Sequence, residues 1–260
     1  MLKQKIQVIF NPAADLGRAR RLESTIHSLV NELGGAEWTP TRQPGHAREL
    51  AIEAGKQGFE RVIAAGGDGT MHETANGLMQ ITAQKRPILG IIPIGSGNDF
   101  AASLGIAMDK TKALESAFNA KSHPVDIGSL QTNSKPKEYW LNVVGIGFDA
   151  VADIRARRMP IFHGFWLYLL AALQTILFNH TPYRFTAKLD GKDWQRELLM
   201  LIISNGRSEG GGFKIAPHAR LDDGLFNLIG VQKISRLRML LTLPYFMRGT
   251  HARLPYVETD

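Results

Sequence analysis

Three apolar segments in the first hundred residues are each followed at once by a loop rich in glycine or turn residues. The segments are IQVIF (6–10), RVIAA (61–65) and ILGII (88–92), and their loops are NPAADLGRA, GGDGT and PIGSGNDFA. Helical patterns separate the segments, so strand and helix alternate to Leu104. This alternation is typical of a Rossmann-like α/β domain with a mainly parallel sheet. Because such loops lie at the carboxyl ends of parallel strands, we expect them to converge on one ligand site.

The pattern changes after a helix expected over residues 109–119. Strand-like segments separated by Gly, Asn, Asp and Pro follow at 123–132, 137–148, 183–190, 195–205 and 224–232. Only one helix, an uncharged apolar segment, is expected among them. The sequence therefore predicts an α/β domain over residues 1–125 and a β-rich, mostly antiparallel domain over residues 126–260.

The glycine loops favour nucleotide binding. Glycine lets the backbone approach a ligand closely, and the amides of a glycine turn that leads into a helix suit a phosphate. Within such a turn, Asp68 would hold a divalent cation or orient a hydroxyl. Simpler interpretations remain open, because Thr70 and Glu73 fit a capping box, and Asn98 could be a helix cap.

Composition and spacing exclude several familiar sites. The chain has no cysteine, which excludes disulfides, a thiol nucleophile and Cys-ligated metals, and predicts an intracellular protein. The loops match neither a P-loop nor G-x-G-x-x-G, and no histidine pair has zincin spacing. Nucleic-acid motifs are also missing, although the net charge is +7.

The positive charge is concentrated in the second half. Residues 1–150 carry 16 basic and 15 acidic side chains, whereas residues 151–260 carry 15 and 9. The second half also contains the uncharged segment Ile161–Phe178, for which a core or interfacial helix is favoured over a membrane span. We expect an anionic membrane to bind this half, which carries both that segment and a set of arginines. Those arginines are Arg155, Arg157, Arg158, Arg236, Arg238 and Arg248.

Several motifs in order resemble one enzyme family. GGDGTMHETANGLM and GIIPIGSGNDFA, then NVVGIGFDA and SNGRSEGGGFKIAPHARLDDGLFNL, are similar to the catalytic domain of diacylglycerol kinases and bacterial lipid kinases. GGDGT alone is shared with sphingosine kinases, NAD kinases and phosphofructokinases, and the later run selects the lipid-kinase branch. The resemblance implies a nucleotide-binding α/β domain, a β-rich lipid and metal domain, and a cleft where ATP and lipid meet.

The resemblance also implies the site residues. Asp68 would be catalytic, and an acidic network would include Asp99 and Asp126. Mg²⁺ would be held by the Asp223 carboxylate and by backbone carbonyls of Arg220 and Leu225, because hard oxygen ligands suit this ion. The residues expected to contact ATP are Asn11, Thr41, Gly66, Gly67, Asp68, Gly69, Thr70, Met71, His72, Gly95, Ser96 and Asn98.

Two departures from the family pattern affect these expectations. The first loop, NPAADLGRA, lacks the glycine that relatives commonly have soon after Asn-Pro. The general base of the family is a Glu in a D-G-E motif, expected beyond Asp260 on strands that the second domain lacks, and Asp190-Gly191-Lys192 does not replace it. The chain is therefore interpreted as either a fragment or a homologue that has lost catalysis.

The sequence thus predicts an ATP- and Mg²⁺-dependent kinase of diacylglycerol or a related lipid, acting in phospholipid metabolism. Expected partners are ATP, the lipid and a peripheral anionic membrane surface at the inner face of the cytoplasmic membrane, with no nucleic acid and with a homodimer left open. The alternatives are a non-catalytic nucleotide- and membrane-binding homologue, and a soluble-substrate kinase of the NAD-kinase type.

Overall fold

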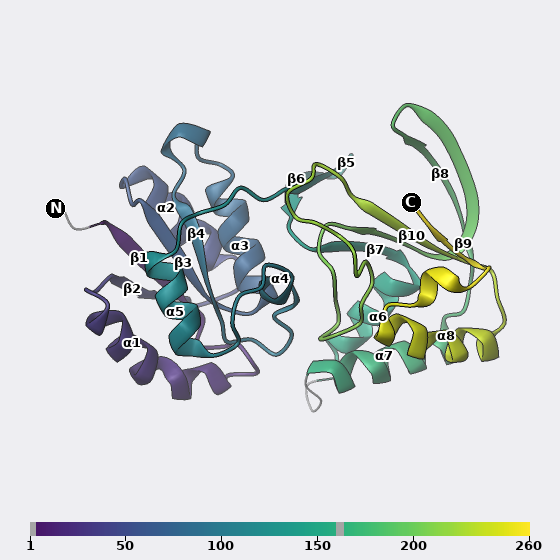
Figure 1. Cartoon of the computed structure of the whole chain (residues 1–260), viewed down its shortest axis with the longest axis horizontal. Helices are drawn as coiled ribbons and strands as arrows, with labels where there is room; N and C mark the ends of the chain where they lie inside the picture. Colours follow the sequence, from purple (N-terminus) through teal and green to yellow (C-terminus); the bar gives the residue numbers. More distant parts are fainter. Residues whose placement is uncertain (1–3, 160–163) are drawn as a thin grey trace. The chain divides into compact units, whose positions relative to one another are not determined.

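The computed structural model describes residues 4–159 and 164–260. They form two compact units, Met1–Leu141 and Asn142–Asp260, each with its own sheet and core (Figure 1). The units divide after Leu141 rather than near residue 125. The reason is that a hairpin after residue 125, expected in the second domain, packs on the first unit.

The first unit is built on a parallel sheet. Its strands lie in the order β2 (Glu37–Pro40), β1 (Ile6–Phe10), β3 (Arg61–Gly66) and β4 (Ile88–Pro93), and each neighbouring pair is parallel. β1 and β3 are buried along their whole length, which explains their almost continuous apolar sequences. From β1 the chain moves outward to β2 and then returns to β3 on the other side of β1, so β1 and β3 flank a topological switch point.

Helices cover both faces of this sheet. Val8 and Phe10 of β1 pack with the helices α1 (Glu23–Glu32) and α5 (Lys110–Asn119), whereas Ile9 packs with α2 (His46–Lys56). Successive strand residues point to opposite faces, so a strand buried on both sides supplies two cores. The remaining helical elements are η1 (Arg18–Leu22), α3 (Asp68–Leu78), η2 (Ala83–Lys85) and α4 (Asp99–Ser103). The expected α/β domain with a parallel sheet is confirmed.

A two-stranded hairpin, β5 (Gly128–Thr132) and β6 (Lys135–Trp140), completes the first unit. The buried Asn76 side chain on α3 holds it by two hydrogen bonds. Asn76 Nδ2 donates to the Tyr139 carbonyl, and Tyr139 N–H donates to Asn76 Oδ1, both at 2.8 Å. These bonds attach the hairpin to the helix that follows the GGDGT loop.

The second unit contains an antiparallel sheet. The order is β11 (Val257–Thr259), β10 (Asn227–Gln232), β9 (Lys192–Ser204) and β7 (Val143–Gly147), and β8 (Tyr183–Leu189) pairs with the first part of β9. Three helices, α6 (Phe148–Ala156), α7 (Gly164–Phe178) and α8 (Arg236–Arg248), group along one side of it and share its core (Figure 1). A short helix, η3 (His251–Arg253), precedes β11. The expected antiparallel sheet is confirmed.

Two sequence predictions in this region were wrong. Residues 137–148 were expected to form one strand, but β6 and β7 belong to different sheets. The strand is interrupted between Trp140 and Val143. In this interruption the Asn142 carbonyl accepts the N–H groups of Asn205 and Gly206 at 2.8 and 3.0 Å. Helices α6 and α8 were also not expected. Gly147, at φ 83°, ends β7 and allows the turn into α6.

The helix α7 lies within the uncharged segment predicted as a core or interfacial helix, and Ile161–His163 lie outside the described residues. Within residues 4–159 and 164–260, no helix has the length and apolarity needed to span a membrane.

Candidate functional site

The side chain of Asn11 links three loops at the carboxyl edge of the parallel sheet. Its Nδ2 donates to Thr70 Oγ1 at 2.8 Å, and its Oδ1 accepts from Thr41 Oγ1 at 3.3 Å and from Ala13 N–H at 2.9 Å. Asn11 follows β1, Thr41 follows β2, and Thr70 lies in the first turn of α3, just after β3. The three loops therefore meet at the switch point between β1 and β3, where open α/β sheets bind their ligands.

The loops after β3 and β4 touch through two glycines. A methyl group added at Gly95 would lie 2.3 Å from the Cα of Gly67, so only glycine allows this approach. Ile94 N–H also donates to the Gly66 carbonyl at 2.9 Å. By contrast, a methyl group at Gly69 would meet nothing within 4 Å. The backbone of the GGDGT loop is thus tightly packed on one side and open at Gly69.

The helix α3 directs its amino terminus into this loop. Thr70 N–H and Met71 N–H both donate to the Gly67 carbonyl, at 3.0 and 3.1 Å. The amides of Asp68 and Gly69 precede them and have no acceptor within the helix, because the first turn of a helix lacks one. Amides of this kind, at the positive end of the helix dipole, suit a phosphate group.

The Asp68 carboxylate connects this loop to the next one. Its Oδ2 accepts the N–H of Asp99 at 3.3 Å, and its Oδ1 accepts the N–H of Phe100 at 3.1 Å, so Asp68 caps the amino terminus of α4. A methyl group at Gly97 would lie 3.0 Å from Asp68 Oδ2 and 3.4 Å from Asp99 Oδ2. Two carboxylates therefore border one glycine at this edge of the sheet.

The capping-box interpretation of Thr70 and Glu73 was wrong. Thr70 Oγ1 accepts from Asn11, and the Glu73 carboxylate accepts the N–H groups of Gly45 and Ala47, at 2.8 and 3.2 Å. Glu73 therefore caps the helix α2. Asn98 does occupy the cap position of α4, as its alternative interpretation expected, and its carbonyl accepts Ala102 N–H at 3.0 Å. Its side chain does not cap the helix but closes the loop on Gly95, with Oδ1 accepting Gly95 N–H at 3.0 Å and Nδ2 donating to the Gly95 carbonyl at 2.7 Å.

Three further predicted nucleotide contacts have different surroundings. Met71 is fully buried, so its side chain belongs to the core. Ser96 is exposed at the tip of its loop. His72 Nε2 lies 2.9 Å from Glu138 Oε1 on β6, and the same oxygen accepts from Arg48 of α2. The His72 side chain is therefore engaged in a cluster with the hairpin.

The residues predicted for Mg²⁺ lie on one loop of the second unit, whereas Asp126 lies between α5 and β5. Asp223 Oδ1 accepts Leu225 N–H at 3.1 Å, which leaves Oδ2 for a ligand, and Arg220 Nε donates to Asp222 Oδ1 at 3.3 Å. In the described part of the chain, no group of three or more His, Asp or Glu side chains is placed to hold a metal ion. One carboxylate and two carbonyls are nevertheless hard oxygen donors, which fit Mg²⁺ chemically.

A pair of carboxyl groups in the second unit was not selected from the sequence. Asp149, in the first turn of α6, makes a side-chain hydrogen bond with Glu209. Burial raises the pKa of Asp149 to about 6, the bond to Glu209 opposes the increase, and Asp153 adds to it. A methyl group at Gly145 would lie 1.6 Å from Asp149 Oδ2, so glycine makes room for the carboxyl group.

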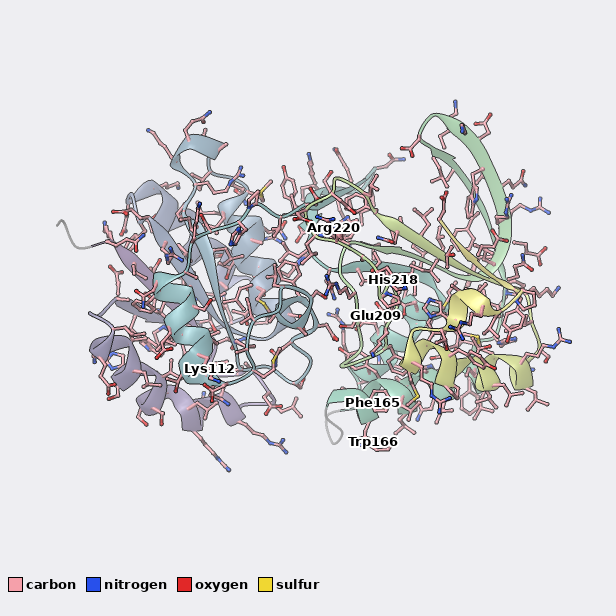
Figure 2. All side chains as sticks on the ribbon, viewed as in Figure 1. Lys112, Phe165, Trp166, Glu209, His218 and Arg220 are labelled. Carbon is pink, nitrogen blue, oxygen red and sulfur yellow. The ribbon has the colours of Figure 1, made fainter. Side chains whose placement is uncertain are left out.

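Figure 2 labels Glu209 in the loop between β9 and β10. No local sequence pattern could identify this pair, because Asp149 and Glu209 are 60 positions apart in the sequence.

Two family models match the chain. The diacylglycerol kinase catalytic domain matches residues 5–130, and the YegS C-terminal NAD kinase beta sandwich-like domain matches residues 142–260. Together they cover most of both units. The first match ends inside β5, and the second begins just after the β5–β6 hairpin.

Curated relatives carry lipid-kinase names. The chain is 31% identical to the diacylglycerol kinase of Bacillus subtilis (strain 168), over 95% of this chain and 80% of that protein. It is 33% identical to the diacylglycerol kinase of Mycobacterium tuberculosis (strain ATCC 25618 / H37Rv), over 98% and 82%. A Chromohalobacter salexigens protein named as a YegS-like lipid kinase is 35% identical over 78% of this chain, and the match spans 64% of that relative's length.

A solved structure has the same fold. A Bacillus anthracis str. Sterne protein described as a candidate diacylglycerol kinase aligns with a TM-score of 0.79, over 99% of this chain and 82% of that chain, at 24% identity. The order of the motifs, both family models and the relatives above 30% identity agree. The chain belongs to the diacylglycerol kinase catalytic-domain family, in its bacterial lipid kinase branch.

Proposed function

We propose that this chain binds ATP at the switch-point loops of its first unit and transfers the γ-phosphoryl group to a hydroxyl of diacylglycerol or a related lipid. The observation that carries the proposal is the convergence of Asn11, Thr41 and Thr70 beside the Gly67–Gly95 contact. The names of the relatives support the lipid as acceptor.

In the proposed reaction, the first unit holds the phosphates of ATP. The open amides of Asp68 and Gly69 donate to phosphate oxygens, and the absence of a side chain at Gly69 leaves room for them. Asn11 fixes Thr70, and Asp68 fixes the following loop through two amides of α4. Phosphoryl transfer depends mainly on positioning and on neutralising charge, so a rigid set of loops is the main contribution of this unit.

Mg²⁺, when bound, would neutralise phosphate charge, and Asp223 with the carbonyls of Arg220 and Leu225 would hold it. The hydroxyl of the lipid must also lose a proton. No Asp-Gly-Glu sequence occurs within residues 1–260, so we assign the base to no residue of this chain. A positioned base typically contributes ~100- to 10,000-fold to the rate.

The direct test is transfer of label from γ-³²P-ATP to lipid. The purified chain is incubated with Mg²⁺ and a panel of lipids in detergent micelles, including diacylglycerol, and the chloroform-soluble product is counted. We expect labelled lipid at a low rate with diacylglycerol or a related lipid, and more if the coding frame continues into an Asp-Gly-Glu segment and is included. Label in a water-soluble acceptor alone would contradict the proposal and favour a kinase of the NAD-kinase type.

Binding of ATP is measured separately by calorimetry, so that a non-catalytic homologue is recognised. ATP binding without lipid product, in the presence of the extended frame, would contradict the kinase proposal and support the binding-protein alternative. Asn11→Ala removes the link between three loops, and we expect ATP binding to be about tenfold weaker. A tenfold loss of affinity is about 1.4 kcal/mol, which is the net contribution of one good hydrogen bond. Asn31→Ala, on the exposed part of α1, is the matched control.

A further inference from the structure

Helix α8 carries apolar side chains on two opposite faces. Met239, Leu243 and Phe246 are buried in the core of the second unit. On the other side, Leu237 and Leu241 are 67% and 61% exposed, and Tyr245 continues the same stripe at the spacing i, i+4, i+8. The inner face explains the fold of the helix, but it does not explain why the outer face is apolar.

Helix α7 shows the same arrangement. Ala172 and Ile176 pack into the core, whereas Trp166 and Phe178 are 69% and 70% exposed, and Leu177 is also exposed. In Figure 2, Trp166 lies at the lower edge of the second unit, where α7 and α8 run in Figure 1. We call these outer residues the α7–α8 surface. It consists of Trp166, Leu177, Phe178, Leu237, Leu241 and Tyr245.

The two helices lie side by side, so these side chains belong to one region. Arg236 Nε, at the start of α8, donates to the Ile176 carbonyl near the end of α7 at 3.2 Å. His180, just after α7, contacts the Ile234 carbonyl at 2.6 Å. An apolar surface formed by two neighbouring helices and rimmed by polar residues marks an interaction site.

The charge of this region favours an anionic partner. Neither α7 nor α8 contains an acidic residue, and α8 carries Arg236, Arg238 and Arg248. Arg238 lies in the first turn of α8, where the helix dipole disfavours a cation. Neither Arg238 nor Arg248 pairs with a carboxylate of the described residues, and both are exposed. Their charges are therefore available to a partner.

A bilayer fits these features better than a second copy of this chain. In a symmetric dimer, the same surface contacts itself, so the arginines of α8 would face each other with no acidic residue on either helix to pair with them. At an anionic bilayer, arginines meet phosphates, and Trp and Tyr occupy the headgroup level while leucines reach the acyl chains.

We propose that the α7–α8 surface binds the surface of an anionic lipid bilayer, with Trp166, Leu237 and Leu241 inserted and Arg238 and Arg248 on lipid phosphates. The inference rests on the proposed function only in that a lipid substrate would be met at a bilayer. Vesicle binding is expected without ATP or substrate, so the two proposals can fail separately.

The test is co-sedimentation of the whole chain with vesicles of phosphatidylcholine, with and without phosphatidylglycerol. We expect binding to the anionic vesicles that weakens with salt. Leu237→Gln with Leu241→Gln should reduce affinity at least about tenfold, because two leucines no longer enter the apolar layer. Arg238→Gln with Arg248→Gln should reduce it by about fivefold per arginine.

Matched controls change similar residues outside the surface. Leu130→Gln removes a leucine that is 48% exposed on β5, and Lys121→Gln removes an exposed cation, so neither should alter vesicle binding. Thermal melting of each variant checks folding. Trp166→Phe provides a second readout. If Trp166 enters the bilayer, brominated lipid should quench the tryptophan fluorescence of the unsubstituted protein more than that of this variant.

Three results would overturn the proposal. The first is equal binding to neutral and anionic vesicles without salt dependence, and the second is vesicle binding that neither double variant reduces. The third is a dimer, detected by light scattering, that dissociates when Leu237→Gln and Leu241→Gln are combined. Loss of vesicle binding with normal phosphorylation of a short-chain, monomeric diacylglycerol would support both proposals. Vesicle binding without any lipid product, from the extended frame as well, would retain this proposal and reject the kinase.

Discussion

At the scale of single residues, two glycines in the switch-point loops have opposite surroundings. Gly95 touches the backbone of Gly67, and Gly69 faces open space. A side chain at Gly95 would conflict with the protein itself, whereas a side chain at Gly69 would conflict only with a bound ligand. The two positions therefore separate what the fold needs from what the ligand needs.

We predict that Gly69→Ala leaves folding unchanged or stabilises the protein by up to about 1 kcal/mol, because alanine favours a helix over glycine. The same change should weaken ATP binding at least about tenfold, because its methyl group occupies the space of a phosphate. Gly95→Ala should lower both stability and ATP affinity. Urea unfolding and calorimetry measure the two quantities, and unaltered ATP binding by Gly69→Ala would contradict the phosphate assignment.

The carboxyl group of Asp149, a half-buried residue of α6, gives a pH dependence. Its pKa is about 6 in the folded chain and 3.8 in the reference state, chiefly because of burial. At pH values between these two pKa values, Asp149 is ionised in the unfolded chain and still largely protonated in the folded chain. The free energy of unfolding therefore decreases as the pH rises. The loss is complete once the pH exceeds the pKa of the folded state, and its scale is set by about 1.4 kcal/mol for each pKa unit that separates the two states.

Asp149→Asn should remove this contribution, so the variant gains stability relative to the unsubstituted protein as pH rises from 4 to 6. Urea unfolding at several pH values measures the difference. Asp193→Asn is the control, because the Asp193 side chain is 90% exposed. Parallel stability curves for Asp149→Asn and the unsubstituted protein would disprove the assignment.

At the scale of elements, Asn76 joins α3 to β6 by two hydrogen bonds to Tyr139. We predict that Asn76→Ala destabilises the first unit by about 1–3 kcal/mol, because it leaves backbone groups of Tyr139 without their partner. Amide hydrogen exchange should increase mainly in β5 and β6. An increase spread evenly over the first unit would instead indicate a general loss of stability.

The sequence predicted the elements whose local pattern follows from their environment. β1, β3 and β4 are buried between helices, so their apolar sequences identified them. Helix α8 was missed because both faces are apolar, it contains Pro244, and arginines occupy its first turn. These features conceal the usual helical period and its start signal.

The same distinction applies to the candidate site. Glycine loops after strands predicted where the loops would meet. The partners of their side chains could not be predicted, because Glu73 caps a helix 26 to 28 residues earlier and His72 meets Glu138 66 residues later. Such partners are chosen by tertiary packing, which a local pattern does not contain.

At the scale of the whole molecule, the uneven charge follows the division into units. The almost neutral first half holds the glycine loops, where amides rather than cations are offered to a ligand. The excess of basic residues lies in the second half, which carries the α7–α8 surface. The two proposals therefore place nucleotide binding and membrane binding on separate units of the chain.

The attachment of the β5–β6 hairpin to α3 has a practical consequence for chimeric proteins. The catalytic-domain match ends at residue 130, inside β5, but Glu138 and Tyr139, which contact α3, come later. Exchanging the first unit with a relative's at residue 130 would join half a hairpin to a foreign second strand. A junction after Leu141 would transfer the hairpin together with the helix that holds it.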